Sequence, residues 1–392
     1  MNLEIPPKIM PDPPIVEASI VQPLLQECSR LDASDLHISP GRPPYFRVHG
    51  VLAPPDGRAP LDAHQVDAMA SELIAPVGEG GLDTTGSVDG AMTATDGTRF
   101  RFNVFRRQGH LAIALRKLED RFRTLAELGL PETLYGLCDL PDGLVVIAGP
   151  TDAGKSTTLA TLVDRINRTR QCHIVTIEDP IEYLHVPVRS LINQRQVGSD
   201  AGSFNDALVA SLRQDPDVIL VGEIRDLPTI RTAITAAETG HLVLTTVHAG
   251  DCVGAIERLV AVFPADEQLG IRRQLSLVLR CIVAQHLIIA DGGDEFSMPQ
   301  QTAPTKRVRV AAAEVLMLNP AVAHLITAGK SSQIYSAMET GAAQNMQTME
   351  HDLARLVVAN LISETTACTY SKHPAVVRDR INLMRKQRSH RR

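Results

Sequence analysis

The sequence has few of the residues that bind nucleic acids. It lacks tryptophan, aromatic residues make up only 3% of its 392 residues, and its formal net charge is −6. Platforms on which bases could stack are therefore scarce, and the charge gives no general reason to expect a polyanion as a partner. We expect no nucleic-acid partner.

Three further absences bear on the cellular setting. The six cysteines are scattered and none forms a C-x-x-C pair, which argues against a zinc site or a disulfide framework and fits a reducing cytoplasm. No apolar run approaches the roughly 18–20 residues that span a bilayer, and the first residues lack the pattern of a signal peptide. We therefore expect a cytoplasmic protein whose membrane association comes through a partner.

The sequence does contain a complete phosphate-binding loop. Residues 149–156 fit the pattern G-x-x-x-x-G-K-[ST], after an apolar run at 143–148 and before a helical pattern at 157–163. In this setting, successive backbone N–H groups form an anion nest at a helix N-terminus. Lys155 reaches the β- and γ-phosphates and Ser156 holds Mg²⁺; the alternative is a glycine-rich turn before a helix. The residues expected to bind the nucleotide are Gly149, Pro150, Thr151, Asp152, Ala153, Gly154, Lys155, Ser156 and Thr157.

The part of the chain before this loop has the pattern of an α+β domain. Prolines cluster in residues 1–15, which predicts an unstructured arm. A helical pattern follows at 16–31, and short alternating stretches then predict an antiparallel sheet with one wet face. These stretches are 35–38, 45–48, 99–105 and 111–118. We predict a first domain over residues 16–118 and a charged linker at 119–124.

Beyond the linker, strand and helix patterns alternate, which is typical of a parallel sheet with helical crossovers. Asp226 is placed to cap the last of these helices, with Pro228 in its first turn and Gly240 just past its end. The predicted strands are 144–148, 173–177, 218–221 and 242–247, and the predicted helices are 155–167, 204–214 and 227–239. The α/β core then covers residues 125–318, with a mobile loop at 291–305, and a helical bundle with a basic tail covers 319–392.

Carboxylates follow two of these strands. Glu223 comes directly after a continuous apolar run, at the strand end that faces the ligand crevice of a parallel sheet. We expect Glu223 near Mg²⁺, directly or through water. Residues 176–182 carry three further carboxylates at another strand end. Because three such charges repel one another, this cluster favours a nearby cation. Taken alone, a strand ending in Glu usually precedes a solvated loop.

Two histidines flank the strand at 242–247. His241 precedes it and His248 follows it, where a sensor of the γ-phosphate is useful. Such a histidine is more often a structural residue than a functional one. Because the pair lies on the sheet that carries the phosphate loop, we count both as candidate catalytic residues.

In this order and spacing, the segments resemble the type II/type IV secretion ATPases. That family shares the phosphate loop, an aspartate box (here residues 176–182), an acidic strand end (residues 217–226) and a histidine box (residues 239–248). Residues 33–38 and 99–103 are similar to motifs of its first domain. The large extra N-terminal domain of the export and assembly members is missing, so the chain is most similar to the pilus retraction, or PilT-like, branch.

The resemblance implies a homohexamer whose subunits combine a PAS-like N-terminal domain with a RecA-like ATPase domain. The resemblance further implies that ATP lies between the two domains and that Glu182 is the general base that orients the attacking water. Glu223 becomes the acid of the Mg²⁺ site. The resemblance also implies an inner-membrane pilus platform protein as a partner and leaves room for a second pilus ATPase beside this one.

The family also draws its positive charge from arginines of the first domain. Arg101 and Arg116 match best, and Arg99, Arg106 and Arg107 match less well. The alternative for each of them is the solvated face of a strand. With Lys155, Glu182, Glu223, His241 and His248, we take Arg101 and Arg116 as the catalytic group.

Three features depart from the family pattern. The family usually has Gly-Ser where this loop has Asp152-Ala153, so an aspartate takes a backbone conformation that suits glycine, and its charge disfavours ATP by about 1 kcal/mol. The stretch 321–326 lacks the arginine of the retraction motif. Seven of the last fifteen residues are Lys or Arg, which we interpret as a solvated helix end rather than a surface that docks on anions.

The sequence thus predicts an ATP-hydrolysing ring that powers type IV pilus retraction, and with it pilin disassembly and twitching motility. The same engine could drive pilus assembly, secretion or conjugation instead. A ring that binds nucleotide without hydrolysing it is a third hypothesis, which Asp152 and the changed stretch 321–326 leave open. A RecA-like nucleic-acid motor finds little support.

Overall fold

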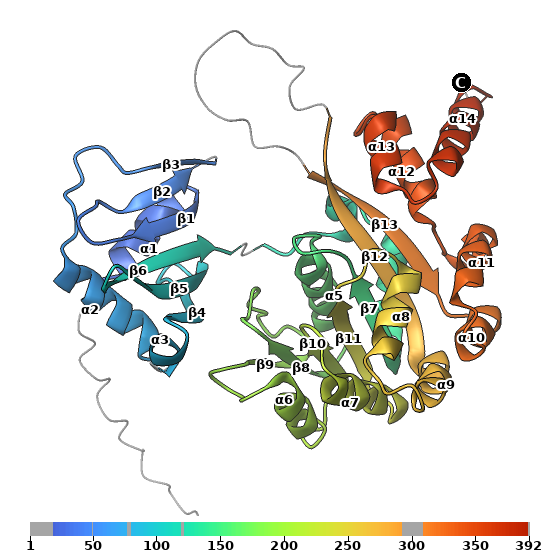
Figure 1. Ribbon diagram of the computed structural model, residues 1–392, viewed down its shortest axis with the longest axis horizontal. Coiled ribbons are helices and arrows are strands. Elements are labelled where there is room, and N and C mark those ends of the chain that lie inside the picture. Colours follow the sequence, from blue (N-terminus) through green and yellow to red (C-terminus); the bar gives the residue numbers. More distant parts are fainter. Residues whose placement is uncertain (1–18, 49, 77–79, 119–120, 292–308, 391–392) are drawn as a thin grey trace, which may run out of the picture. The chain divides into compact units, whose positions relative to one another are not determined.

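The structure is a computed structural model that describes residues 19–48, 50–76, 80–118, 121–291 and 309–390. The chain forms two compact units, Met1–Leu118 and Glu119–Arg392, and each has its own buried apolar core (Figure 1). The arm predicted at 1–15 and all but the first residue of the loop predicted at 291–305 lie outside the described residues.

The first unit is built on a six-stranded antiparallel sheet with the strand order β3-β2-β1-β6-β5-β4. Its alternating strands divide the side chains between two faces. In β5, Phe100 and Phe102 are buried while Arg101 between them is exposed. The elements are α1 (Gln22–Arg30), β1 (Ala33–Ile38), β2 (Tyr45–Val48), β3 (Val51–Ala53), α2 (Ala63–Ile74), α3 (Gly80–Thr84), β4 (Ser87–Thr93), β5 (Arg99–Arg107) and β6 (His110–Lys117).

The second unit is built on a seven-stranded sheet with the order β13-β12-β7-β11-β10-β8-β9. Every neighbouring pair is parallel except β12 and β13. The elements up to the last strand are α4 (Leu125–Leu128), η1 (Glu132–Asp139), β7 (Gly143–Ala148), α5 (Lys155–Thr169), β8 (His173–Glu178), β9 (Leu191–Gln196), α6 (Phe204–Ser211), β10 (Val218–Val221), α7 (Leu227–Glu238), β11 (Leu242–Val247), α8 (Cys252–Ala261), α9 (Gln268–Val278), β12 (Leu279–Ile289) and β13 (Arg309–Met317).

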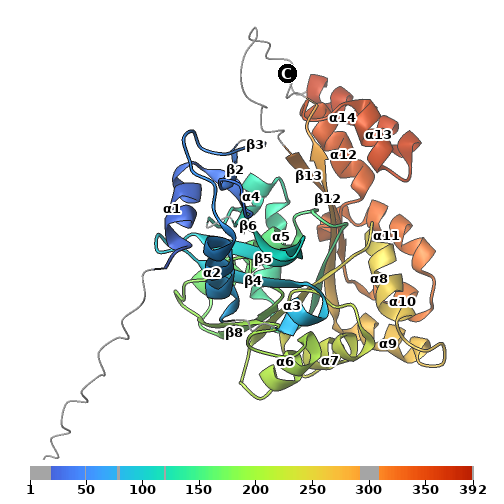
Figure 2. The same cartoon turned by 60° about the vertical axis from the view of Figure 1, so that its left-hand side comes forward.

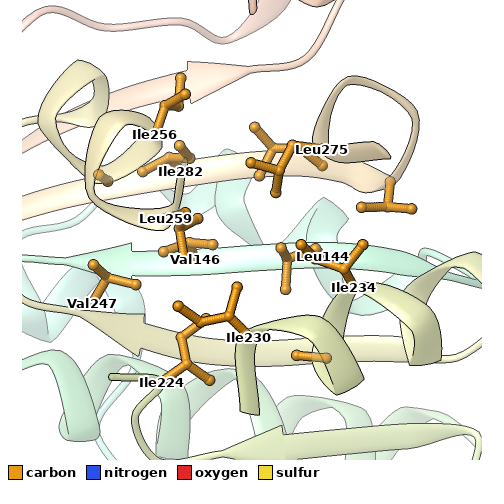
Figure 3. Close-up of a cluster of buried hydrophobic side chains, with 14 of the residues drawn as sticks. Leu144, Val146, Ile224, Ile230, Ile234, Val247, Ile256, Leu259, Leu275 and Ile282 are labelled. Atoms are coloured by element: carbon orange, nitrogen blue, oxygen red, sulfur yellow. The ribbon is translucent and has the colours of Figure 1, made fainter. Parts of the chain in front are cut away.

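Helices cover both faces of this sheet. All residues of β7, β10 and β11 are buried, as expected for parallel strands between two helical layers. One apolar cluster joins one face of the sheet to α7, α8 and α9, and a second joins the other face to α5 and η1. In Figure 3, Ile234 of α7 and Leu275 of α9 lie close to Leu144 of β7. This packing fixes the carboxyl ends of the central strands, where the candidate site lies.

The carboxyl-terminal segment is helical. Its last three helices pack together against β13 around a separate apolar cluster that includes Leu353 and Ile381 (Figure 2). The elements are α10 (Pro320–Thr327), η2 (Ser331–Gln333), α11 (Ile334–Thr340), η3 (Ala342–Gln344), α12 (Met349–Val358), α13 (Glu364–Tyr370) and α14 (Pro374–His390). No helix among the described residues is long and apolar enough to cross a membrane.

The predicted elements of the second unit agree with the structure, with one shorter helix. The four predicted strands match β7, β8, β10 and β11, and Asp226 caps α7 by accepting a hydrogen bond from the backbone N–H of Thr229. The helix predicted to reach residue 214 ends at Ser211, because the chain turns there and Asp215 takes a left-handed φ of 54°. The sequence did not predict β9, β12 or β13.

Candidate functional site

The phosphate loop joins the central strand β7 to helix α5. Helix α5 begins at Lys155, and Gly154 occupies its N-cap position with a left-handed φ of 83°. The N–H groups of the first turn of α5 therefore point toward the loop. Glycine is also required at Gly149, where a Cβ atom would lie 2.5 Å from the backbone oxygen of Gln285.

The Lys155 side chain folds back over this loop. The residue is only 8% exposed, and its ammonium group donates to the carbonyl oxygens of Gly149 (3.1 Å) and Pro150 (2.7 Å). Burial lowers the pKa of Lys155 below its ordinary value, and the negative charges of Glu223 and Asp152 oppose that shift. The loop thus has a lysine charge at its centre, together with the exposed residue Ser156.

Asp152 takes the backbone conformation that the sequence predicts for it. Its φ is 61°, in the left-handed region that glycine adopts without cost. Aspartate tolerates this region better than most residues. The residue is exposed at the tip of the loop, so its charge lies on the surface that faces away from the core.

Gln285 on strand β12 forms hydrogen bonds with the phosphate loop and with α5. The sequence did not predict this role. Its side chain is almost fully buried. The amide nitrogen donates to the carbonyl oxygen of Ala153 (2.6 Å), and the amide oxygen accepts from the hydroxyl of Thr158 (3.0 Å). A glutamine inside the apolar run 281–289 was the signal available in the sequence. Gln285 joins the loop to the first turn of α5.

Glu223 lies at the carboxyl edge of the sheet with two partners. Arg225 donates to its Oε2 atom across 2.7 Å, and Nε2 of His248 lies 3.8 Å from the same oxygen. Burial lowers the pKa of His248, and the positive charges of Lys155 and Arg225 lower it further. His248 is therefore neutral near pH 7, able to donate or accept a hydrogen bond beside Glu223.

Glu182 belongs to the loop that follows β8 and is partly buried. Its charge acts on Lys155, as do the charges of Glu223 and Asp152. The next residue, Tyr183, shares a hydrogen bond with the hydroxyl of Thr157 (3.0 Å), directly after the phosphate loop. The structure therefore brings Lys155, Glu182, Glu223 and His248 to one edge of the sheet.

The two candidate arginines of the first unit lie side by side. Arg101 of β5 is paired in register with Arg116 of β6, which is paired with Asp35 of β1. The carboxylate of Asp35 accepts from Arg116 at 2.9 Å and lies 3.4 Å from Arg47. Burial raises the pKa of Asp35, but Arg116, Ser34 and Arg47 lower it below its ordinary value. The Asp35 carboxylate thus faces Arg116 and Arg47, two of the three arginines that lie on these neighbouring strands.

Comparison with known proteins identifies the family. The model of the type II/IV secretion system protein family matches residues 11–363. The chain belongs to this family. It is 40% identical to the type IV pilus retractation ATPase PilT of Pseudomonas aeruginosa, an alignment that covers 90% of this chain and 98% of that protein. It is 39% identical to a twitching motility protein of Neisseria gonorrhoeae, with 83% of each chain covered.

Solved structures of the family give the same fold. A crystal structure of the pilus retraction motor PilT with bound ADP matches with a TM-score of 0.81 and 39% identity, covering 92% of this chain and 98% of that one. The predicted fold class is therefore confirmed: an α+β first domain and a RecA-like P-loop core followed by a helical bundle.

One candidate residue of this family member lies away from the others. His241 precedes β11 and His248 follows it, so the strand separates the two by roughly 20 Å. The backbone oxygen of His241 accepts from the N–H of Gly143, at the amino end of β7. Its Nδ1 atom lies 2.9 Å from the carbonyl oxygen of Ala236. His241 therefore lies in the turn between α7 and β11, away from the other candidate residues.

The changed retraction motif lies on a helix of the C-terminal segment. Residues 321–326 fall within α10, which Asn319 caps by accepting from the backbone N–H of Val322 (2.8 Å). Val322 and Ile326 are buried against the neighbouring helices, whereas His324 is exposed. The stretch without the arginine is therefore part of a helix that is anchored by its apolar face.

Proposed function

We propose that the chain is an ATPase that assembles as a homohexamer and powers type IV pilus retraction. The observation that carries the proposal is the meeting of Lys155, Glu182 and Glu223 at one edge of the sheet. It occurs in a chain that matches a named pilus retraction ATPase over almost the whole length of both. The same chain is similar to the structure of a retraction motor that holds ADP.

The residues at this edge suit Mg²⁺-ATP. Backbone N–H groups of the loop 149–157, apart from Pro150, which has none, and the ammonium group of Lys155 would hold the phosphates. No group of three or more His, Cys, Asp or Glu side chains suited to a metal occurs among the described residues, so Ser156, Glu223 and the phosphates would hold Mg²⁺. The ion supplies charge neutralisation on the phosphates when bound.

The remaining residues act on the attacking water and on the charge that develops during hydrolysis. Glu182 orients the water and accepts its proton. His248, neutral near pH 7, donates a hydrogen bond to the γ-phosphate while Glu223 stays paired with Arg225. Arg101 and Arg116 supply positive charge to the transferred phosphoryl group.

The proposal also includes a place of action. We place the hexamer at the cytoplasmic face of the inner membrane, against a pilus platform protein, and the likeness of the chain to pilus retraction proteins supports this part of the proposal. A second pilus ATPase would act beside it. The exposed basic side chains of α14, such as Arg385 and Arg388, are the solvated end of a helix in this proposal.

A regulatory ring that binds nucleotide without hydrolysing it is the second candidate. The observation that favours it is Asp152, which places a carboxylate in the left-handed position of the phosphate loop. Lys155, Glu182 and Glu223 are nevertheless all present at the site, and a ring without turnover has no use for the general base.

Two experiments test the proposal. In the first, ATP hydrolysis by the purified full chain is measured together with its assembly state, and we expect turnover by a hexamer. Absence of turnover in the purified hexamer, with the Glu223→Gln variant no slower, would reject the motor in favour of the regulatory ring. In the second, the gene is deleted. Cells with excess pili support retraction, whereas bald cells indicate assembly by the same engine.

A further inference from the structure

The loop that carries Glu182 is tied to the edge strand β9 by one side chain. The amide nitrogen of Gln194 donates to Oε1 of Glu178 (3.2 Å) and to the backbone oxygen of Tyr183 (2.8 Å). Its amide oxygen accepts from the backbone N–H of His185 (2.8 Å). The two acceptors and the one donor fix the orientation of the amide, because a flipped amide would lose all three bonds.

Glu178, one of these acceptors, is itself held at the end of β8. Its carboxylate also accepts from the hydroxyl of Thr176 (2.7 Å). Burial raises the pKa of Glu178, while the hydrogen bonds from Thr176 and Gln194 lower it. The loop that carries Glu182 is therefore held by Gln194 at the two residues Tyr183 and His185, directly on the carboxyl side of Glu182.

We infer that Gln194 is a positioning residue for ATP hydrolysis, which holds the Glu182 loop in place from strand β9. The inference rests on the proposed role of Glu182 as the general base. A base must lie within hydrogen-bond reach of the water it activates, and a shift of about 1 Å can reduce turnover by about a hundredfold. Gln194 touches neither nucleotide nor water in this role. It acts through the backbone of Tyr183 and His185.

Other bonds keep the loop folded when Gln194 is changed. The backbone N–H of Ile181 donates to Gln196 (3.3 Å), and that of Val188 donates to Asn167 (2.9 Å). The hydroxyl of Tyr183 also keeps its bond with Thr157. A variant at Gln194 therefore loosens the segment around Glu182 and leaves both ends of the loop attached.

The test compares two changes of amide to acid on the same strand. Gln194→Glu keeps the acceptor for His185 but replaces the two N–H donors with an oxygen that faces the Glu178 carboxylate. The matched control is Asn193→Asp. Asn193 is exposed, and its amide lies 2.8 Å from Nε2 of His173, at the other end of β8.

We expect kcat of the full-length Gln194→Glu protein to fall tenfold or more, with the Kd for Mg²⁺-ATPγS within about threefold of the wild-type value. Hydrogen exchange of the peptide that contains residues 180–186 should be faster, and exchange of α5 should not change. Asn193→Asp should keep the wild-type kcat. An unchanged kcat in Gln194→Glu, or an equal loss of kcat and of nucleotide affinity, would overturn the inference.

The failure of this inference can be told apart from the failure of the proposed function. In a Glu182→Gln background, Gln194→Glu should cause no further loss of kcat, because its effect passes through the Glu182 carboxylate. An additional loss would place Gln194 in another role. If Glu182→Gln is as active as the wild type, the proposed base is wrong, whatever the exchange of the loop shows.

Discussion

The imidazole of His248 lies 3.8 Å from the carboxylate of Glu223, although the two residues follow different strands. Their strands, β11 and β10, are parallel neighbours in register. Residues just beyond the carboxyl ends of such strands meet at one edge of the sheet, where α/β proteins bind their ligands. The pair therefore joins the acidic strand end to the histidine box within one site.

Replacing Glu223 with glutamine should lower kcat for ATP by at least about a hundredfold, because the neutral side chain keeps its shape but loses the charge that faces the metal. Steady-state hydrolysis measures the loss, and ATP titration shows whether binding survives. Glu238→Gln is the control, since Glu238 is exposed at the end of α7 and contacts Gln274. Activity within threefold of the wild type in Glu223→Gln would remove Glu223 from the site.

The aspartate in the phosphate loop should weaken nucleotide binding. Asp152→Gly removes a charge near the phosphates and suits the left-handed backbone, so the Kd for ATP should fall by about fivefold, or roughly 1 kcal/mol. Asp152→Asn separates the two effects, because asparagine tolerates the same backbone without the charge. Titration calorimetry measures both variants. Equal affinities for the three proteins would show that solvent screens the charge of Asp152 completely.

The support that Gln285 gives the loop can be tested in the same way. Gln285→Met keeps the volume of the buried side chain but removes its bonds to Ala153 and Thr158. The Thr158 hydroxyl keeps its bond to the carbonyl oxygen of Gly154 (3.2 Å), but the carbonyl oxygen of Ala153 loses the Gln285 donor. Loss of a buried hydrogen-bond partner costs about 1–3 kcal/mol, and we expect the Kd for ATP to rise by about tenfold. Gln274→Met is the control, because the half-buried Gln274 of α9 makes its side-chain bond to Glu238 and none to the phosphate loop. A Kd equal to that of the control would limit Gln285 to a packing role.

The sequence predicted the parts of the site that depend on local pattern. The phosphate loop, strands β7, β8, β10 and β11 and the left-handed backbone of Asp152 all follow from neighbouring residues. Gln285 and Gln194 were missed because their partners lie on other elements: the phosphate loop and α5 for Gln285, and the end of β8 and the loop after it for Gln194. No local pattern reports such contacts. Both glutamines lie on strands, β12 and β9, and the position of these strands in the sheet could not be predicted from the sequence.

His241 shows a second limit of prediction from the sequence. Only the carboxyl ends of parallel strands face the ligand crevice. This rule places Glu223 at the ligand edge of the sheet. The same rule excludes from that edge a residue that precedes its strand. The family motif groups His241 with His248 because they are close in sequence. Strand β11 then carries them to opposite edges of the sheet.

Removing Asp35 should disturb the arginines beside it. In Asp35→Asn, Arg116 and Arg47 lose the charge that orients them. If Arg116 acts on the phosphoryl group, we expect kcat to fall about tenfold with a smaller effect on ATP binding. Arg116→Ala should cause a loss at least as large, and Arg30→Ala, an exposed residue of α1, should cause none. Normal kcat in both Asp35→Asn and Arg116→Ala would leave these residues on the solvated face of a strand.

The His185 imidazole should make the protein less stable in acid. Its ring stacks on Phe122 at 4.6 Å, its buried Nδ1 atom has no hydrogen-bond partner, and burial lowers its pKa from 6.5 to about 4. As the pH falls below 6.5, His185 becomes protonated in the unfolded chain but stays neutral in the folded chain. This contribution to the free energy of unfolding is therefore lost between pH 6.5 and about 4, by up to roughly 3 kcal/mol.

His185→Phe should remove this loss, because phenylalanine can stack on Phe122 without titrating, and the backbone bond to Gln194 remains. Urea unfolding of the full chain at about pH 7 and about pH 4.5 measures the effect in both proteins. Other titrating groups act equally in each, so the difference between the two proteins isolates His185. The wild type should lose about 2 kcal/mol more than the variant on acidification. An equal loss in both would mean that His185 is hydrated and titrates near its ordinary pKa.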